Sequence, residues 1–363
     1  MKKTLLIQID GKMPNLALMK ISTYHKKKRD EVKLFNFVKP RREIPLALYG
    51  KSKFDYVYIS CIFTKNRNLA LDVAKLYPDS KVFIGGSGIN YINLPGEIEH
   101  LKPDYDLYKI NYSMGFTSRG CIRKCPWCVV PEKEGKIRDN AHIKEFMDKR
   151  HEKLILLDNN FLASPNWERN LKYIIRKKIK VNFNQGLDIR LIEHDNLVLL
   201  KKTKYYNASF KGHYLTFAWD LVEIEEQVIK GIQTLFNYGF KKSNIRLYIL
   251  CGYDTTTLDQ DLHRAYILRE FGIRPFAMPY NGRTNDKKLN AFVRWVNRPE
   301  AFMSIPFDEY TRKERRCKNC GHLERKHSGP EGKRRCYAEV FYWDTGRKKI
   351  NICSCRKFEC EDI

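Results

Sequence analysis

Three cysteines close together in the sequence are the residues best suited to chemistry. Cys121, Cys125 and Cys128 have the spacing C-x3-C-x2-C within one short loop. Thiolates are the ligands that iron–sulfur clusters require, and three of them can hold three irons of a four-iron cluster while the fourth iron stays open. A structural zinc site needs a fourth ligand, and no further Cys or His lies close by. The spacing therefore favours an open [4Fe–4S] cluster over zinc.

A second group of cysteines lies in a basic, glycine-punctuated segment that begins near residue 312. This segment is too small to hold a core without help, which indicates a module stabilised by metal. Its Cys-x2-Cys pair resembles a zinc knuckle, and an auxiliary iron–sulfur cluster is the alternative. The mixed Cys and His content favours zinc. The candidate zinc ligands are Cys317, Cys320, His327, Cys336, Cys353 and Cys355.

With Cys360, the last member of the second group, nine of the 11 cysteines belong to these two groups. The other two, Cys61 and Cys251, lie in apolar segments and are expected to be small buried residues of strands. The first residues become charged too soon for a secretory signal, so a reducing, cytoplasmic location is expected. No apolar run approaches the roughly 18 residues of a membrane span, so no membrane partner is expected.

The net charge is the second unusual feature of the chain. Lys and Arg number 68 against 42 Asp and Glu, which gives a net charge of +26. Such a balance suits a polyanion such as nucleic acid, and it equally suits a solvated, lysine-rich surface. Because the positive residues are spread along the chain, the charge alone leaves both interpretations open.

Strands and helices alternate in the first part of the chain, which implies a parallel sheet with helices on its faces. The predicted strands cover residues 5–9, 32–35, 56–63 and 82–84, and the predicted helices cover 16–25 and 69–76. The last strand ends in Gly85-Gly86-Ser87-Gly88. These glycines let the backbone approach a ligand closely, or they form a tight turn.

A second series of βα units must position the first cysteine group. One strand precedes Cys121, and further strands are predicted at 154–157, 181–184, 215–218, 246–250 and 273–278, with helices at 143–149, 167–178 and 224–238. The pattern predicts a partial (β/α) barrel or a strongly curved parallel sheet, in which chemistry takes place at the carboxyl ends of the strands.

Polar residues follow four of these strands. They are Asp158-Asn159-Asn160, Asn184-Gln185, Asp220 and the segment Gly252-Tyr253-Asp254. Each group alone is explained by helix N-capping, for which Asp and Asn are well suited. Four such groups at converging strand ends favour a ligand site.

The cysteine spacing resembles the signature of the radical S-adenosylmethionine (radical SAM) superfamily, CxxxCxxC with an aromatic residue before the last cysteine, here Trp127. The flanking segments 115–121, 129–131 and 134–138 are similar to the branch that contains cobalamin-dependent radical SAM enzymes and methylthiotransferases. This resemblance implies a partial (β/α)6 barrel, a [4Fe–4S] cluster that binds S-adenosylmethionine (SAM), and cleavage of SAM to a 5′-deoxyadenosyl radical.

The resemblance also implies roles for the residues at the strand ends. The segment after the second strand would hold the amino group of SAM, the segment after the third would meet its ribose or carboxylate, and the segment after the fifth would support its adenine. The residues implied in cofactor binding are Trp127, Asp158, Asn159, Asn160, Asn184, Gln185, Asp188, Arg190, Asp220 and Gly252.

In the same branch the domain before the cluster is often a Rossmann-like cobalamin-binding domain. The usual Asp-x-His-x-x-Gly is missing after the first strand, where Asp10 is present without the histidine. Either cobalamin binds without an axial histidine, or the domain has lost it and serves as a scaffold or substrate platform, and the missing histidine favours the second interpretation. Methylthiotransferases carry three further cysteines in this region, and the presence of Cys61 alone argues against that activity.

The sequence thus predicts an α/β protein with three domains, at residues 1–105 (Rossmann-like), 106–310 (partial barrel) and 311–363 (metal-binding tail). Its predicted function is radical SAM chemistry on an unidentified substrate, with an electron donor such as flavodoxin or ferredoxin as partner. The charge and the tail favour a nucleic acid as substrate, and a small molecule or peptide is the alternative. The alternative from another class is a non-catalytic protein that binds zinc and nucleic acid, with all cysteines structural.

Overall fold

The amino-terminal part of the chain forms a parallel sheet of four strands in the order β2-β1-β3-β4. The strands are β1 (Lys3–Gln8), β2 (Glu31–Asn36), β3 (Tyr56–Ser60) and β4 (Lys81–Gly85). Strand β1 is buried along almost its whole length because it lies in the interior of the sheet and both of its faces are covered.

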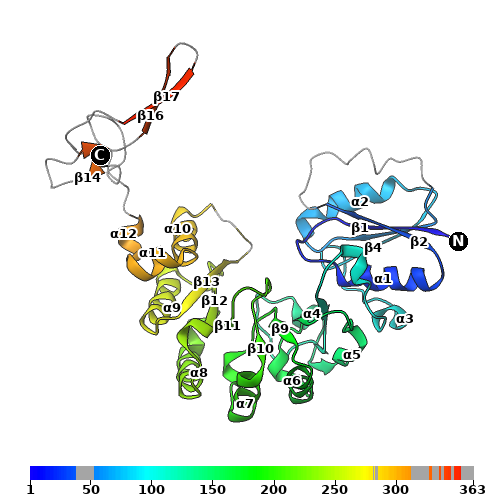
Figure 1. Ribbon diagram of the computed structural model, residues 1–363, viewed down its shortest axis with the longest axis horizontal. Helices are drawn as coiled ribbons and strands as arrows, with labels where there is room; N and C mark the ends of the chain where they lie inside the picture. The colour runs from blue at the N-terminus through cyan, green and yellow to red at the C-terminus, as the bar shows by residue number, and fades with distance from the viewer. Residues whose placement is uncertain are drawn as a thin grey trace. The chain divides into compact units, whose positions relative to one another are not determined.

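Helices α1 (Leu16–Lys27) and α2 (Arg67–Lys75) cover opposite faces of this sheet (Figure 1). Leu6 of β1 packs with Leu18 of α1, whereas its neighbour Ile7 packs with Val73 of α2. This division follows from the alternation of side chains along a strand. The short helix α3 (Gly96–Glu99) follows and contributes Ile98 to the α1 side.

The next part of the chain forms two parallel sheets with the orders β10-β9-β8-β5 and β11-β12-β13. A parallel bridge between Leu187 and Phe217 links them beyond the end of β9. The strands are β5 (Ser113–Gly115), β8 (Lys153–Leu156), β9 (Lys180–Phe183), β10 (Lys204–Tyr205), β11 (Leu215–Ala218), β12 (Ile245–Cys251) and β13 (Arg274–Pro279). A two-residue hairpin, β6 (Ser118–Arg119) with β7 (Arg138–Asp139), encloses the cysteine loop.

Helices follow these strands and form an outer layer (Figure 1). They are α5 (Ile143–Phe146), α6 (Trp167–Arg176), α7 (His194–Lys202), α8 (Glu225–Asn237) and α9 (Leu258–Glu270). The short helix α4 (Val130–Lys133) instead follows the cysteines within the β6–β7 loop. In α6 the buried residues Leu171 and Ile174 form the inner side, as the helical period requires.

A second compact unit, Thr284–Ile363, is separate from the first, Met1–Arg283. It contains α10 (Lys287–Val296), α11 (Pro299–Ser304) and α12 (Phe307–Thr311). Rings of Phe292, Trp295, Phe302 and Phe307 pack together as its core. The short strands β14 (His327–Ser328), β15 (Arg335–Cys336), β16 (Glu339–Asp344) and β17 (Arg347–Ile352) pair as two antiparallel ribbons.

The structure is a computed structural model that describes residues 1–37, 53–280, 282 and 285–311, together with the backbone of β14 to β17. The predicted α/β class with parallel sheets is confirmed. The closed geometry of a partial barrel and the metal in the tail stay predictions. In the described part of the chain, none of the helices has the length and apolar character needed to cross a membrane.

The glycine turn after β4 makes a close backbone contact inside the first sheet. Gly86 has φ +102°, and a Cβ atom there would lie 2.4 Å from the carbonyl oxygen of Cys61. A Cβ atom on Gly88 would lie 2.7 Å from the carbonyl carbon of Phe63. The sequence left open whether these glycines approach a ligand or form a tight turn. The structure shows a tight turn packed against the backbone of Cys61 and Phe63.

We expect Gly86→Ala to lower the free energy of unfolding by about 2–4 kcal/mol, from strained φ and overpacking. Gly85→Ala is the matched control, because no atom lies within 4 Å of the added Cβ. Denaturant unfolding of the two variants measures the difference. Equal stability of the variants would contradict this explanation of the turn.

Candidate functional site

The cysteine loop leaves β6 beside the carboxyl ends of the parallel strands. Cys121, Cys125 and Cys128 are half-buried and none forms a disulfide. Burial raises the pKa of the Cys125 and Cys128 thiols, and the nearby Asp220 carboxylate adds to the shift. A ligand that binds these thiols must therefore displace their protons.

Among the described residues, no group of three or more Cys, His, Asp or Glu side chains converges closely enough for a single metal ion. A single zinc ion needs every ligand within about 2.3 Å of one point. An iron–sulfur cluster binds each thiolate to a different iron, so its ligands can lie further apart. Three free, half-buried thiols on one loop are the kind of donor set that an iron–sulfur cluster requires.

Gly120 determines how the chain enters this loop. Its φ is +78°, and a Cβ atom would lie 2.3 Å from the carbonyl oxygen of Lys136. The N–H of Cys121 donates to the carbonyl of Gly135 at 3.2 Å. Only glycine fits where the two ends of the loop cross so closely.

The carboxylate of Glu134 holds three parts of the site together. It accepts hydrogen bonds from the Gly120 N–H at 3.0 Å, from Arg119 Nη1 at 3.1 Å and from Asn159 Nδ2 at 2.7 Å. Burial would raise the pKa of Glu134, but the Gly120 N–H and the charge of Arg119 outweigh it, so the pKa is lowered. Glu134 is therefore a buried carboxylate that stays ionised.

Arg119 extends this contact to the amino-terminal sheet. Its second nitrogen, Nη2, pairs with Glu99 of α3 at 3.0 Å, and Glu99 pairs with Lys20 of α1 at 2.9 Å. The side chains of these residues are 8–18% exposed, so water screens their charges weakly. Lys20, Glu99, Arg119 and Glu134 form a chain of alternating charges from α1 to the first cysteine, named here the charge chain.

Asp158, after β8, is fully buried and fully engaged. Its carboxylate accepts hydrogen bonds from the N–H and hydroxyl groups of Thr117 and Ser118, at distances of 2.6–3.2 Å. Burial raises its pKa, and these hydrogen bonds oppose the shift. The geometry gives Asp158 a positioning role toward the segment before the cysteines.

Asn160 is the residue of this strand end that reaches the cysteines. Its Nδ2 donates to Cys121 Sγ at 3.6 Å and to Asp188 Oδ2 at 3.3 Å. Its Oδ1 is buried without a hydrogen-bond partner among the described residues. A buried carbonyl oxygen left without a partner is costly, so this atom is suited to a ligand that donates a hydrogen bond.

Asp188, after β9, ties the cysteine loop to the third strand end. It accepts from Arg123 Nε at 3.0 Å and from Arg190 Nε at 2.7 Å. Burial would raise the pKa of Asp188, but the two guanidinium groups lower it overall. Asn184 is half-buried and Gln185 exposed in the same segment, and in the described structure neither side chain bonds to another site residue.

At the end of β12 an unpredicted ion pair fixes the backbone. Arg264 of α9 is fully buried, pairs with Asp261 and donates to the carbonyls of Trp219 and Leu250. Asp261 accepts from the Gly252 N–H at 3.0 Å. The pair therefore clamps the ends of β11 and β12, beside Asp220, whose pKa burial raises to about 6.

Aromatic rings close this side of the site. Trp127 in the cysteine loop packs edge-on against Tyr253 at 5.4 Å between centroids, and Tyr253 packs against Tyr280 at 5.0 Å. Such edge-to-face contacts add to the burial of apolar surface. The cysteine loop is thus in contact with the strand ends after β8, β9 and β12.

Sequence reasoning missed Arg119, Asp261 and Arg264 as site residues and gave Glu134 no individual role. The only local signal was the i, i+3 spacing of Asp261 and Arg264, which is common on exposed helices. The candidate ligands Cys317, Cys320, Cys353 and Cys355 lie outside the described residues. The backbone of His327 pairs with that of Cys336, and nothing is described of their side chains.

The amino-terminal strand ends do not fit a cobalamin site built on the loop after β1. Asp10 accepts from the N–H groups of Ile62 and Phe63 at 2.7 and 3.0 Å and from Asn66 Nδ2 at 2.9 Å. Its carboxylate thus binds groups of the loop after β3, and the glycine turn described above packs against the same loop. Among the described residues, this edge of the sheet is therefore held together by its own loops.

No protein-family model matches the sequence, and no curated protein matches it significantly. Several solved structures resemble the chain, among them the following two. OxsB, a cobalamin-dependent S-adenosylmethionine radical enzyme, aligns with TM-score 0.41 and 14% identity over 77% of this chain and 49% of its own. SuiB of Streptococcus suis, solved with S-adenosylmethionine bound, aligns with TM-score 0.37 and 15% identity over 65% and 55%.

The chain therefore spans about half the length of each of these two proteins. Since both TM-scores lie below 0.5, we infer the function from the site and not from these similarities.

We expect Glu134→Gln to destabilise the protein by about 1–3 kcal/mol, because Arg119 and the Gly120 N–H lose a buried anionic partner. The exposed Glu132, changed to Gln, is the matched control. A lowered carboxyl pKa stabilises the fold above the unfolded value of 4.5 and ceases to do so as the pH falls through the folded pKa. The free energies of unfolding of wild type and variant are compared at pH 7 and near pH 3, and we expect the difference between them to be smaller at the lower pH. A difference independent of pH would contradict this role of Glu134.

Proposed function

We propose that this protein is a radical SAM enzyme. The observation that carries the proposal is the three-cysteine loop held against the strand ends by Asn160, Asp188 and Tyr253. Supporting it are the C-x3-C-x2-C spacing, the half-buried free thiols and a donor set that suits iron and sulfide.

In this proposal Cys121, Cys125 and Cys128 hold a [4Fe–4S] cluster and the strand ends hold SAM. When bound, the cluster and SAM together supply a 5′-deoxyadenosyl radical that abstracts hydrogen from the substrate. A donor such as flavodoxin or ferredoxin would supply the electron. The residues of this chain bind, orient and shield these groups.

Asn160 is the residue best placed to orient SAM. Its unpartnered Oδ1 can accept a hydrogen bond from an ammonium group, while its Nδ2 is fixed by Cys121 and Asp188. The second fixed contact sets the direction of the amide plane. Asn160 would thereby orient an amino group beside the thiol of Cys121.

The neighbouring residues restrict the site in two further ways. Asp188 pairs with Arg123 and Arg190, so its charge is balanced and its main contribution is to immobilise the loop. Trp127 and Tyr253 give the site an apolar wall near Gly252, which would exclude water from a reactive intermediate.

The other parts of the chain have supporting roles in the proposal. The domain at residues 1–105 acts as a scaffold through the charge chain, without cobalamin. The tail at residues 311–363 holds zinc.

We expect wild-type protein purified without oxygen to contain iron and sulfide and to form 5′-deoxyadenosine from SAM and dithionite. Cys125→Ala should lose this activity by at least about a thousandfold and lose most of the iron, because a cluster held by two thiolates is labile. Cys251→Ala, a buried cysteine outside the loop, should keep both.

A wild-type protein with zinc but no iron would instead favour the non-catalytic alternative. Retention of SAM cleavage by Cys125→Ala would equally rule out the proposed site.

A further inference from the structure

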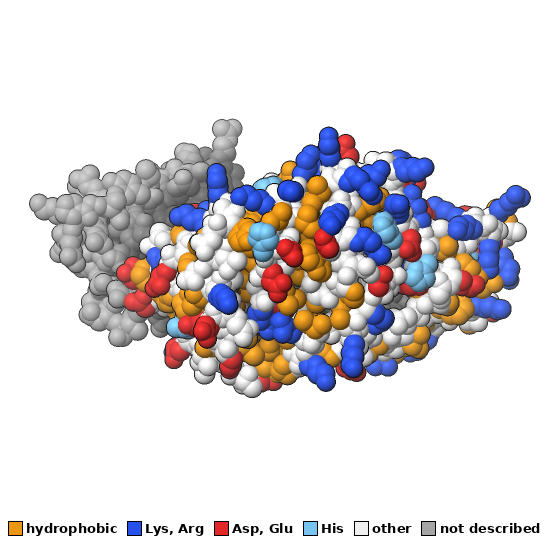
Figure 2. Space-filling view, turned by 90° about the horizontal axis from the view of Figure 1, so that it is seen from below, with side chains coloured by type: hydrophobic (Ala, Val, Ile, Leu, Met, Phe, Trp, Pro, Cys, Tyr) orange, Lys and Arg blue, Asp and Glu red, His pale blue; other side chains and the backbone are white. Residues whose placement is uncertain are grey.

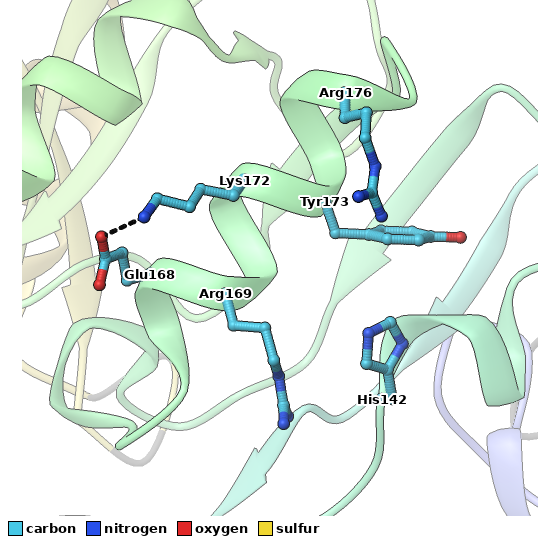
Figure 3. A pocket seen from close by; sticks show the side chains of 6 residues that line it. All are labelled: His142, Glu168, Arg169, Lys172, Tyr173 and Arg176. Atoms are coloured by element: carbon cyan, nitrogen blue, oxygen red, sulfur yellow. Dashed lines mark ion pairs between the residues drawn. The ribbon is translucent and has the colours of Figure 1, made fainter.

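A cationic cavity lies on the outer layer of helices, between α5 and α6. It has a volume of about 320 Å³, large enough for a phosphate-sized group and its hydration shell. Figure 3 shows the side chains that line it. They are His142, Glu168, Arg169, Lys172, Tyr173 and Arg176.

The helical repeat explains why positive charges gather there. Arg169, Lys172 and Arg176 are spaced at i, i+3 and i+7, which places them along one side of α6. Lys172 points away from the cavity centre toward Glu168, with which it pairs at 2.6 Å (Figure 3). The two arginines remain to line the hollow beside Tyr173 and His142.

These two guanidinium groups are poorly neutralised. Arg169 lies 3.5 Å from Asp139 of the β6–β7 hairpin, a long and exposed contact. Arg176 has no carboxylate partner among the described residues and lies 5.7 Å from the Tyr173 ring centre. The cavity therefore has an excess of positive charge at its wall.

His142 packs edge-on against the Tyr173 ring at 5.2 Å between centroids, with Arg176 on the other side of that ring (Figure 3), and it offers a further donor. Its Nδ1 accepts the N–H of Lys144 at 3.0 Å, so in the neutral ring the proton is on Nε2. Burial lowers the pKa of His142, and the charges of Arg169 and Lys144 add to the effect. An anion in the cavity would relieve this repulsion.

A row of lysines continues the positive charge beyond Arg176. Arg176 ends α6, and Lys180 begins the next strand, β9. Lys180 is in register with Lys153 of β8 on one side and Lys204 of β10 on the other. Like charges on neighbouring strands repel one another, and the described ion pair of this row, Lys180 with Glu152 at 3.5 Å, is long and exposed, so it offsets the repulsion only in part.

We propose that the cavity between α5 and α6 binds a phosphate of a nucleic-acid backbone and that the lysine row holds the phosphates that follow. Guanidinium groups match the geometry of phosphate oxygens and can donate to them in pairs. A single small anion in the cavity would engage the arginines alone, and Lys180 would keep only its long, exposed pair with Glu152 at 3.5 Å. A polyanion with regular charges satisfies both features.

The net charge of the chain agrees with this assignment. Figure 2 shows Lys and Arg side chains spread over the face in view, with Asp and Glu between them. At +26 the protein attracts polyanions, and the cavity gives that attraction a defined contact. RNA binding at this cavity is independent of the proposed radical SAM activity, because it requires neither SAM nor a reductant.

The test compares two double variants of the full-length protein that each lose two positive charges. Arg169→Gln/Arg176→Gln changes the cavity, and Lys27→Gln/Lys75→Gln removes exposed charges from α1 and α2 as the control. The probe is a fluorescein-labelled single-stranded RNA of about 20 nucleotides, longer than a typical site. Anisotropy gives its affinity between about 50 and 200 mM salt.

We expect the cavity variant to bind the RNA at least about tenfold more weakly and the control to stay within about twofold of wild type. The salt slope of the cavity variant should fall by about 1.4, at about 0.7 for each lost contact to a single strand. Unchanged thermal midpoints would show that both variants fold.

Equal affinities of the two variants would overturn the proposal. It would also be overturned if the cavity variant lost binding of inorganic phosphate or of a labelled polyglutamate peptide while its RNA affinity stayed that of wild type. Loss of phosphate binding alone would indicate a small-anion site, and loss of polyglutamate binding alone would indicate a site for acidic protein segments.

Discussion

The cysteine loop depends on one buried carboxylate. Glu134 accepts the N–H of Gly120, pairs with Arg119 and accepts from Asn159, so it fixes the residue before Cys121 and the end of β8 together. Gly120 can take its conformation only because it lacks a side chain. A short loop with three thiols has little structure of its own, and these contacts supply it.

The charge chain connects this loop to the amino-terminal sheet. Lys20 is buried on α1, and burial lowers its pKa while Glu99 opposes the shift. A buried lysine without a partner would be strongly destabilising, so the chain of ion pairs is needed once Lys20 is in place. The amino-terminal sheet and its helices thereby support the cysteine loop through Lys20 and Glu99.

Local sequence patterns predicted the parallel strands and the cysteine loop, since apolar runs and ligand spacing are local. They could not distinguish the roles of Asp158 and Asn160. The carboxylate of Asp158 already accepts hydrogen bonds from Thr117 and Ser118, whereas Oδ1 of Asn160 has no partner among the described residues. That distinction depends on the three-dimensional partners of each side chain. The same holds for Arg264, because its acceptors are carbonyls distant in sequence. The net charge also did not predict where the basic cavity lies, because that depends on the side of α6 on which Arg169 and Arg176 lie.

The most direct test of the central claim is electron paramagnetic resonance of the anaerobically purified, dithionite-reduced protein before and after addition of SAM. Three thiolates on the loop leave one iron open, so the spectrum of a reduced [4Fe–4S] cluster should appear and shift when SAM binds. An unchanged spectrum would show that no iron is open to SAM. A protein without a cluster signal that holds zinc at the three cysteines would contradict the account.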